Sequence, residues 1–256
     1  MPKQGEIDYL RLSGEDGIQF ARDKPFSAVD CGRTFQDLGI IFSVLPKPPA
    51  RLLDLGVGTG WTSVFFGKRG YDVVGQDIAE DMIHQANINK ARYDTPNVQF
   101  ITTDYEHLHF ESEFDCAVFY DSLHHAEDEK SALRAVYQAL KPGGLCVTVE
   151  PGKGHATSID SLKAVARFGV TERDMPPSLI IAGALEAGFK EYRVFHRFME
   201  PVELPAHLFQ VAHPILHWAR TFYLSMKDSA PFRGWRRRRR FLRDVRHGNH
   251  IVVLFK

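Results

Sequence analysis

One segment of the sequence places three glycines within five residues, close to an acid. It reads DLGVGTGW over residues 54–61 and lies between a short apolar run and a helix-like run. Backbone N–H groups at such a junction, together with the helix dipole, favour an anionic ligand group. Trp61 takes the third glycine position of the dinucleotide fingerprint, and the Lys-Ser/Thr pair of a Walker loop is missing. The segment therefore predicts a ligand without a pyrophosphate.

Two further acids follow the next two strand-like runs. Asp77 stands 21 residues after Gly56, where a carboxylate can accept hydrogen bonds from both hydroxyls of a ribose. Asp104 ends the third run beside Tyr105, where a carboxylate can accept a hydrogen bond from an adenine amino group and the ring can cover the base. Together with the glycines, these acids predict a site for an adenosine with a zwitterionic tail.

Two adjacent histidines follow the fourth strand-like run. The sequence SLHH, residues 122–125, places two imidazoles at its carboxyl end, where an imidazole can act as general base for an alcohol. Glu150 closes the fifth run, where its carboxylate can hold the Nδ1–H of a histidine and raise the ring's basicity. Alternatively, either histidine caps a helix or is buried in the core. His213 and His217 stand four residues apart without an evident third ligand, so the sequence predicts no metal site.

Alternating strand-like and helix-like runs must position these residues. Five apolar runs separated by helix-like runs indicate an α/β fold with a doubly wound parallel sheet, which two later runs extend to seven mostly parallel strands. The expected strands are 51–55, 71–78, 98–104, 114–121, 144–150, 192–199 and 250–256. The expected helices are 61–68, 80–92, 129–140 and 179–187, and the sequence KPG at 141–143 is expected to end the third of these.

About 50 residues separate the last two expected strands, which is too long for a hairpin turn, so the sequence predicts a structured α-helical insertion there. We expect an N-terminal helical cover at 1–50, a cofactor-binding core at 51–200, an aromatic and basic insertion at 201–248 and a final core strand at 249–256. The acceptor of any reaction is expected over the carboxyl ends of the strands, beneath the cover and the insertion.

Charge is distributed unevenly along the chain. Residues 1–200 have a net charge of −8 and residues 201–256 a net charge of +8, including five consecutive arginines, Arg236 to Arg240. Such a run is usually a solvated helix face; the alternatives are an anionic membrane, a phosphorylated acceptor or RNA. Because an aromatic, nearly uncharged segment precedes the arginines, peripheral contact with an anionic membrane is favoured among these. The acidic remainder argues against nucleic acid.

Composition is that of a globular protein. The chain has 256 residues, of which 44% are hydrophobic and 25% charged, enough apolar mass for a sizeable core. Its three cysteines are far apart and form no Cys-x-x-Cys pair, so neither a disulfide framework nor a zinc ribbon is expected. The sequence shows no secretory signal and no uninterrupted apolar stretch long enough to span a membrane. These features favour a cytoplasmic protein.

Five motifs, in order and spacing, resemble those of class I S-adenosylmethionine-dependent methyltransferases. They are DLGVGTGW, the acid of QDIAED, TTDYEHL, FDCAVFYDSLHH and ALKPGGLCVTVEP, over roughly residues 50–152. The resemblance implies a Rossmann-like fold and S-adenosylmethionine as cofactor. It implies that the glycines line the methionine tail, that Asp54 helps to hold its ammonium, that Asp77 binds ribose and that Asp104 binds adenine. The expected cofactor-binding residues are Asp54, Gly56, Gly58, Gly60, Asp77, Ile78, Asp104, Tyr105 and Asp121.

The histidine pair and the acid of the fifth strand resemble those of sugar O-methyltransferases, in which the first histidine is the base. Carried over, His124 is the expected catalytic base and Glu150 its partner. The expected reaction is methyl transfer to a hydroxyl of a small molecule, a sugar or lipid-linked glycan. The metal-dependent catechol type does not fit, because the fifth strand ends in Glu150-Pro151 rather than Asp-Asn. An enzyme acting on nucleic acid or protein, and a non-catalytic binding module, are the alternatives.

Overall fold

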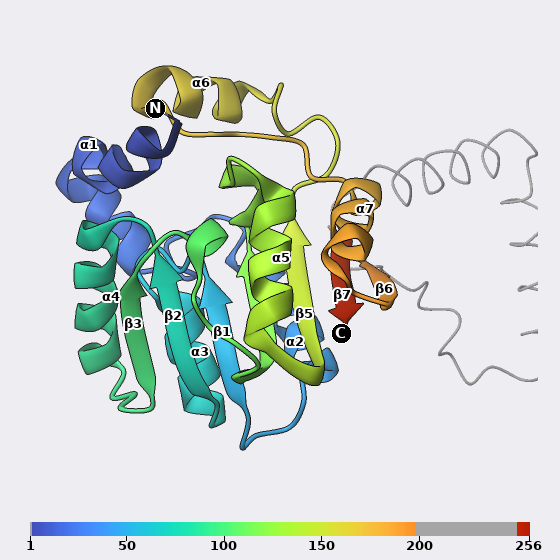
Figure 1. Ribbon diagram of the computed structural model, residues 1–256. Helices are drawn as coiled ribbons and strands as arrows, with labels where there is room; N and C mark the ends of the chain where they lie inside the picture. Colours follow the sequence, from blue (N-terminus) through green and yellow to red (C-terminus); the bar gives the residue numbers. More distant parts are fainter. Residues whose placement is uncertain (1, 198–249) are drawn as a thin grey trace, which may run out of the picture. The chain divides into compact units, whose positions relative to one another are not determined.

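A single sheet of seven strands organises the part of the chain that the structure, a computed structural model, describes: residues 2–197 and 250–256 (Figure 1). The strand order is β3-β2-β1-β4-β5-β7-β6. β7 is antiparallel to both of its neighbours, β5 and β6, and the other pairs are parallel. The strands are β1 (Arg51–Leu55), β2 (Asp72–Asp77), β3 (Val98–Thr102), β4 (Phe114–Tyr120), β5 (Leu140–Glu150), β6 (Glu191–His196) and β7 (His250–Phe255). The predicted Rossmann-like α/β fold is confirmed.

Helices cover both faces of the sheet. They are α1 (Pro2–Arg22), α2 (Cys31–Val44), α3 (Trp61–Arg69), α4 (Glu80–Arg92), α5 (Glu129–Ala139), α6 (Ile159–Phe168) and α7 (Pro177–Ala187), with short 3-10 helices η1 (Tyr105–His107) and η2 (Leu123–His125). In Figure 1, α5 lies in front of the sheet and α3 behind it. None of the helices in the described part of the chain is long and apolar enough to cross a membrane.

Two apolar cores, one on each face, hold the sheet between the helices. On one face, Leu133 of α5 and Ile180 of α7 pack in the same cluster as Phe119 of β4. On the other face, Ile41 of α2 and Phe66 of α3 pack among strand residues. All five side chains are at most 1% exposed. Because both faces are covered, the inner strands consist of almost continuous apolar residues, which is why the sequence shows them clearly.

The carboxyl ends of the parallel strands point toward α1 and α6, which lie across that end of the sheet (Figure 1). The two helices contact each other: the rings of Tyr9 in α1 and Phe168 in α6 meet edge to face with centroids 4.9 Å apart. α1 bends at Gly14, whose φ of 71° lies in the left-handed region that favours glycine. The bend lets one helical segment follow the curved top of the sheet.

Some local expectations differ from the structure. α5 ends at Ala139, and β5 begins at once at Leu140, so the KPG sequence expected to separate them lies inside the strand. The pairing of β4 with β5 shifts register between Phe114 and Cys116, which absorbs these residues as a bulge. α6 was not expected. The predicted insertion at 201–248, including Arg236 to Arg240 and their membrane contact, lies outside the described residues and stays a prediction.

Candidate active site

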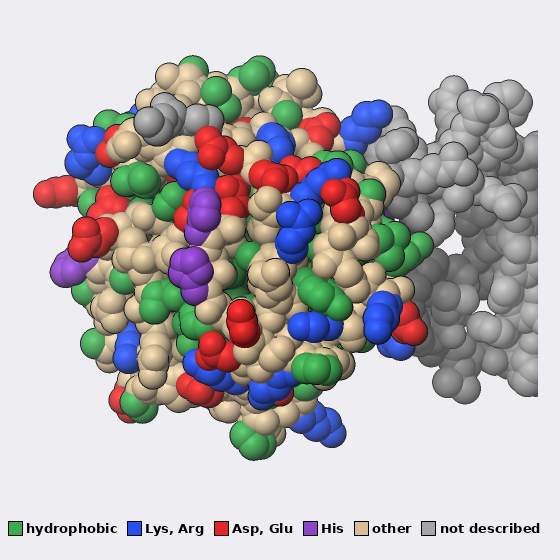
Figure 2. Space-filling view, in the orientation of Figure 1, with side chains coloured by type: hydrophobic (Ala, Val, Ile, Leu, Met, Phe, Trp, Pro, Cys, Tyr) green, Lys and Arg blue, Asp and Glu red, His purple; other side chains and the backbone are tan. Residues whose placement is uncertain are grey.

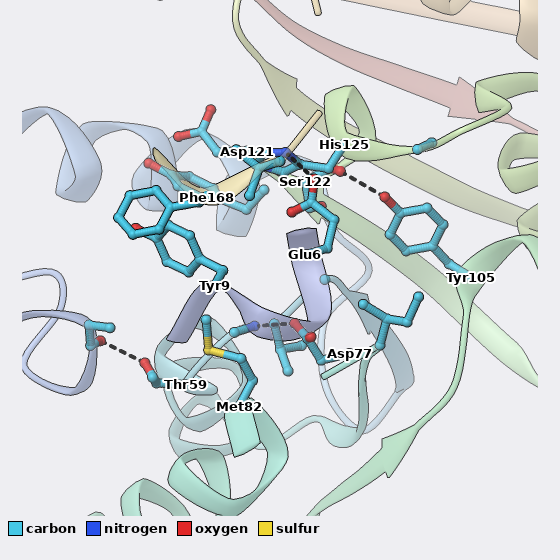
Figure 3. A pocket seen from close by; sticks show the side chains of 18 of the residues that line it. Glu6, Tyr9, Thr59, Asp77, Met82, Tyr105, Asp121, Ser122, His125 and Phe168 are labelled. Carbon is cyan, nitrogen blue, oxygen red and sulfur yellow. Dashed lines mark hydrogen bonds and ion pairs between the residues drawn. The ribbon is translucent and has the colours of Figure 1, made fainter. Parts of the chain in front are cut away.

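A cavity of about 410 Å³ opens at the carboxyl ends of the strands. The sheet side contributes the loops after β1, β2, β3 and β4, and α1 contributes Lys3, Glu6 and Tyr9, which follow one another at helical spacing. Phe168 of α6 and Glu172 in the loop after it complete the cover. Figure 3 shows the ring pair of Tyr9 and Phe168 side by side, with Glu6 between this pair and Tyr105 in that view.

The three glycines of the β1–α3 loop have different environments. All three have positive φ, 66° at Gly56, 52° at Gly58 and 75° at Gly60. A Cβ on Gly58 would meet only Met82 Sδ, at 3.9 Å, so this backbone faces open space in the cavity. A Cβ on Gly60 would lie 2.6 Å from Phe100 Cζ. Gly60 does not line the cavity, so the structure gives it a role in helix packing rather than the predicted contact with a ligand.

An alanine at Gly58 is expected to weaken cofactor binding at least tenfold, because its methyl group fills the open space beside the loop. The positive φ should also cost about 1–2 kcal/mol of folding free energy. Gly143→Ala is the matched control, since Gly143 has a φ of 78° and open space around it but lies outside the cavity lining. Calorimetric titration with S-adenosylhomocysteine and chemical denaturation check both effects. Equal affinities of the two variants would contradict a ligand contact at Gly58.

Asp77 lies at the centre of the cavity floor. Its Oδ2 accepts a hydrogen bond from the Gly58 backbone N–H at 2.7 Å, and its Oδ1 accepts one from Ala79 N–H at 3.0 Å (Figure 3). Burial raises the pKa of this carboxyl to about 6, despite the two hydrogen bonds that act in the opposite direction. Each oxygen keeps acceptor capacity for a further donor. Asp77 and the neighbouring Ile78 both line the cavity, as the sequence predicts.

Asp54 occupies a different place from the one predicted. Its Oδ2 accepts hydrogen bonds from the hydroxyls of Thr62 and Ser63, both at 2.6 Å, at the start of α3. The residue is 1% exposed and does not line the cavity, and burial raises its pKa to about 6. In this structure Asp54 joins β1 to α3, because the two hydroxyls direct its carboxylate into the protein, and its expected contact with the ammonium of a ligand stays a prediction.

Asp104 and Tyr105 line the cavity beyond β3. Asp104 accepts a hydrogen bond from the Glu106 backbone N–H at 2.9 Å and forms an ion pair with Lys3 of α1. Burial alone would raise the pKa of Asp104, but the Lys3 ammonium and the backbone hydrogen bond more than offset it and lower the pKa. The Tyr105 hydroxyl donates to the Ser122 carbonyl at 3.1 Å, which fixes its ring at the cavity wall. The sequence does not predict the ion pair between Asp104 and Lys3.

The predicted pair of His124 and Glu150 is present, but it lies behind the cavity. His124 Nδ1 is 2.7 Å from Glu150 Oε2, and Glu150 Oε1 also accepts the Leu123 backbone N–H at 2.8 Å. Burial would raise the pKa of Glu150, whereas the hydrogen bonds from His124 and the backbone lower it overall. His124 is 4% exposed, its Nε2 is 3.6 Å from Glu172 Oε2, and it does not line the cavity.

The imidazole that lines the cavity is His125 rather than His124, whose role as base stays a prediction. Its Nδ1 lies 2.5 Å from the Thr171 carbonyl oxygen, to which it must donate, and 3.4 Å from Glu6 Oε1. Burial lowers the pKa of His125, but the carboxylates of Glu6 and Glu172 outweigh burial and raise it to about 9. At neutral pH the ring is therefore a cation that donates hydrogen bonds.

Two carboxylates at this end of the cavity were not singled out in the sequence. Glu6 Oε1 accepts the Thr171 backbone N–H at 2.7 Å, and Glu172 Oε2 lies 2.6 Å from His155 Nε2. Both line the cavity. Neither has a local motif: each belongs to a segment far in sequence from the strand ends and reaches them only through the packing of α1 and the loop after α6. The spacing of Lys3, Glu6 and Tyr9 on one helix face was the available signal.

Asp121 follows β4 and lines the cavity, as predicted. Its φ of 47° is rare for a residue other than glycine, and its backbone N–H donates to the Val149 carbonyl at 2.8 Å. Desolvation of the Asp121 carboxyl by the surrounding protein raises its pKa, and the positive charge of Arg197 acts in the opposite direction. Backbone strain of this kind is concentrated at functional sites, because the surrounding fold must hold it in place.

These features fit an adenosine cofactor with a zwitterionic tail and no pyrophosphate. The open backbone at Gly58 admits a ligand, Asp77 presents a carboxylate at the end of β2, and Asp104 presents another beyond β3. The loop contains no lysine or arginine that would pair with phosphates. A doubly wound sheet with this arrangement at its carboxyl edge is typical of Rossmann-like proteins that bind a nucleoside cofactor.

Comparisons with known proteins agree with this class. Residues 53–148 match a family model described as a methyltransferase domain. The sequence is 30% identical to tRNA 5-carboxymethoxyuridine methyltransferase of Escherichia coli K12 over 43% of this chain and 44% of that protein. It is 30% identical to demethylmenaquinone methyltransferase of Thermus thermophilus over 63% of this chain and 71% of that protein. A solved structure, phosphoethanolamine N-methyltransferase 2 of Haemonchus contortus, matches with a TM-score of 0.65 at 21% identity, covering 98% of this chain and 60% of that chain.

The chain belongs to the S-adenosylmethionine-dependent methyltransferases. This confirms the predicted class and the predicted cofactor, S-adenosylmethionine. The chain spans less than half the length of the first of these relatives, 44%.

Proposed function

We propose that this chain transfers the methyl group of S-adenosylmethionine to a small molecule bound in the same cavity. One observation carries the proposal: the same cavity is lined by Gly58, Asp77 and Asp104 and also by Glu6 and His125. The first set suits the cofactor, and the second set supplies polar groups to a neighbouring acceptor. α1 and α6 cover both, which excludes water from the space between them.

The residues that would hold the cofactor follow from their places in the cavity. Asp77 would accept the ribose hydroxyls, and the backbone of Gly56 and Gly58 would face the methionine tail. Asp104 would accept the adenine amino group, sharing its carboxylate with Lys3, while the Tyr105 ring lies against the base. The cofactor supplies a methyl group already activated by its sulfonium, so the protein has mainly to orient the acceptor and accept its proton.

The predicted hydroxyl acceptor depends on an imidazole that acts as a base. His124 faces carboxylates from both ring nitrogens, and His125 is held as a cation by Glu6 and Glu172. His124 is buried outside the cavity lining and His125 is held as a cation, so neither ring is placed to deprotonate an alcohol in the cavity. The carboxylates of Glu6 and Glu172 line the cavity, where each can accept a proton. A sugar or lipid-linked glycan hydroxyl is thus not the acceptor that this geometry supports best.

Nucleic acid is the second candidate acceptor, because one relative is a tRNA methyltransferase. On the face shown in Figure 2, lysine and arginine side chains are interspersed with acidic ones rather than gathered in a patch. Nucleic-acid binding typically uses a continuous basic surface. The charge of the described residues therefore favours a small molecule over RNA.

Methyl transfer from radiolabelled S-adenosylmethionine into cell extracts tests the proposal. We expect label in a low-molecular-weight fraction that has been freed of RNA and protein, and much less label with the Asp77→Ala variant at the same subsaturating concentration of S-adenosylmethionine. Label found only in RNA would support the second candidate. Binding of S-adenosylhomocysteine without transfer to any fraction would indicate a non-catalytic binding module and would contradict the proposal.

A further inference from the structure

The cavity carries an excess of negative charge. Among the described residues that line it, the acidic ones outnumber the basic ones by more than two to one. The acids are Glu6, Asp77, Asp104, Glu106, Asp121, Glu127 and Glu172, and the bases are Lys3, Lys24 and His125. S-adenosylmethionine brings one net positive charge, which leaves most of this excess uncompensated. An anionic acceptor would be repelled, and a cationic one would be attracted.

Aromatic rings line the same cavity. Tyr9 and Phe168 form an edge-to-face pair with an interplanar angle of 66°, and both belong to the cover that faces the carboxyl ends of the strands (Figure 3). Phe20 of α1 adds a third ring from the cover. The faces of aromatic rings attract ammonium groups, and the attraction is larger where water is excluded. Rings and carboxylates together form a binding site typical of an amine or quaternary ammonium group.

Glu6 and Glu172 are held in place rather than free to turn toward solvent. Glu6 accepts the Thr171 backbone N–H at 2.7 Å and lies 3.4 Å from His125 Nδ1. Glu172 lies 2.6 Å from His155 Nε2 and 3.6 Å from His124 Nε2. Side chains fixed in this way lose little conformational entropy when a ligand binds. The two carboxylates therefore form a preorganised negative site next to the expected position of the cofactor.

We propose that the acceptor is a small amine, held by the Glu6 and Glu172 carboxylates and covered by the Tyr9–Phe168 ring pair, and that the product is methylated on nitrogen. This rests on the proposed function. The amine enters as an ammonium ion, and one proton passes from nitrogen to the Glu6 carboxylate and then to solvent. The nitrogen lone pair forms the new C–N bond while the C–S bond breaks with its electrons left on sulfur. S-adenosylhomocysteine and the methylated ammonium ion leave.

The same side chains offer one rival occupant. His124, His125 and Glu172 present nitrogen and oxygen atoms that all lie within 4.8 Å of one another, a group that a divalent cation can use as ligands. The hydrogen bonds already made by these residues, to Glu150, to the Thr171 carbonyl and to His155, account for them without a metal. These hydrogen bonds favour the amine over a cation, and the two occupants give different results in the experiment.

The experiment compares amines with neutral molecules of the same shape, using the full chain saturated with S-adenosylhomocysteine. The pairs are choline with 3,3-dimethylbutan-1-ol, dimethylethanolamine with 3-methylbutan-1-ol, and tyramine with 4-propylphenol. We expect at least one amine to bind at least tenfold more tightly than its neutral partner, measured by calorimetry. Dimethylethanolamine and tyramine, or related amines of the better-bound shape, should then give an N-methylated product by mass spectrometry.

Matched variants locate the effect. Glu172→Gln and Glu6→Gln should each weaken binding of the amine at least tenfold and leave binding of its neutral partner unchanged. Glu172→Asp should restore part of the affinity, which separates charge from folding. Glu186→Gln is the control, because Glu186 is an exposed carboxylate that pairs with Lys130 outside the cavity. S-adenosylhomocysteine affinity is measured for every variant, and loss of it in the parent would mean that the proposed function itself fails.

Two results would overturn the amine. The first is equal binding of amines and neutral partners, or amine binding that survives both glutamine variants, with S-adenosylhomocysteine binding intact. The second is stabilisation by Mn²⁺ or Mg²⁺ but by no amine, lost in His125→Ala and Glu172→Gln, which would identify the cluster as a metal site.

Discussion

Replacement of Glu150 by alanine is expected to lower the free energy of unfolding by about 3–5 kcal/mol, the largest stability loss that we predict for this protein. Glu150 is 1% exposed and accepts hydrogen bonds from the His124 ring and from backbone N–H groups of η2. Its removal leaves these donors buried without a partner. Denaturation with guanidinium chloride measures the loss, and Glu150→Gln, which keeps one acceptor oxygen, should lose less.

A double-mutant cycle with His124→Ala separates the pair from its surroundings. The sum of the stability losses of Glu150→Ala and His124→Ala should exceed the loss of the double variant, because each single variant leaves the other residue buried without its partner. The pKa of Glu150 is lowered from 4.5, so its contribution to stability is present above about pH 4.5 and is lost as the pH falls through the lowered value. A parent and a Glu150→Ala variant with the same denaturation midpoint at neutral pH would refute this structural role.

Replacement of Asp77 by alanine is expected to weaken binding of S-adenosylhomocysteine by about 2–3 kcal/mol, roughly 30- to 150-fold, as expected for a charged acceptor of two ribose hydrogen bonds. Loss of the hydrogen bond to Gly58 N–H adds to this effect by releasing the loop. Calorimetry on the folded variant measures it. Asp54→Asn is the control, since Asp54 is also a buried aspartate and does not line the cavity. Unchanged affinity in Asp77→Ala would remove Asp77 from the site.

The same carboxyl predicts a pH dependence of binding. With a pKa raised from 3.8 to about 6, Asp77 becomes protonated as the pH falls through 6 and then accepts hydrogen bonds less well. Affinity for S-adenosylhomocysteine should therefore fall below about pH 6 in the parent and stay flat in Asp77→Asn. The effect on folding has the opposite sign. Because the pKa of Asp77 is higher in the folded state, the free energy of unfolding should fall as the pH rises from about 4 to about 6, and the loss should remain above pH 6. A parent affinity that is independent of pH from 5 to 8 would contradict the assignment.

Gly58, Asp77 and Asp104, which were predicted to bind the cofactor, line the cavity, because they belong to local motifs at strand ends. Their contacts with a cofactor stay predictions. DLGVGTGW, Asp77 and Asp104 each lie at or just past the end of a strand, and strand ends of a parallel sheet meet at one edge. Gly60 belongs to the same motif but does not line the cavity. Its motif position resembles that of Gly58, yet Phe100 of a neighbouring strand, and not a ligand, is what a side chain there would meet.

The acceptor end is less predictable because it depends on contacts between distant segments. The rings of His124 and His125 have centroids only 4.0 Å apart, and the sequence does not distinguish them. The His124 ring is buried and bonded to Glu150 of β5, whereas the His125 ring is bonded to the Thr171 carbonyl and lines the cavity. Glu6 reaches the site only because α1 crosses the end of the sheet. Tertiary packing determines which of these side chains reach the cavity, and a local sequence pattern does not predict it.

The position of β7 between β5 and β6 has a consequence for biosynthesis. β7 is the last of the seven strands to leave the ribosome, yet it pairs with both neighbours, and β6 pairs only with β7. During translation, β5 therefore keeps an unpaired edge until residues 250–255 emerge, while strands β1 to β5 can already assemble. An exposed edge of this kind invites pairing with other nascent chains. Slow synthesis over the final segment would prolong that exposure, and deletion of the last strand would make it permanent.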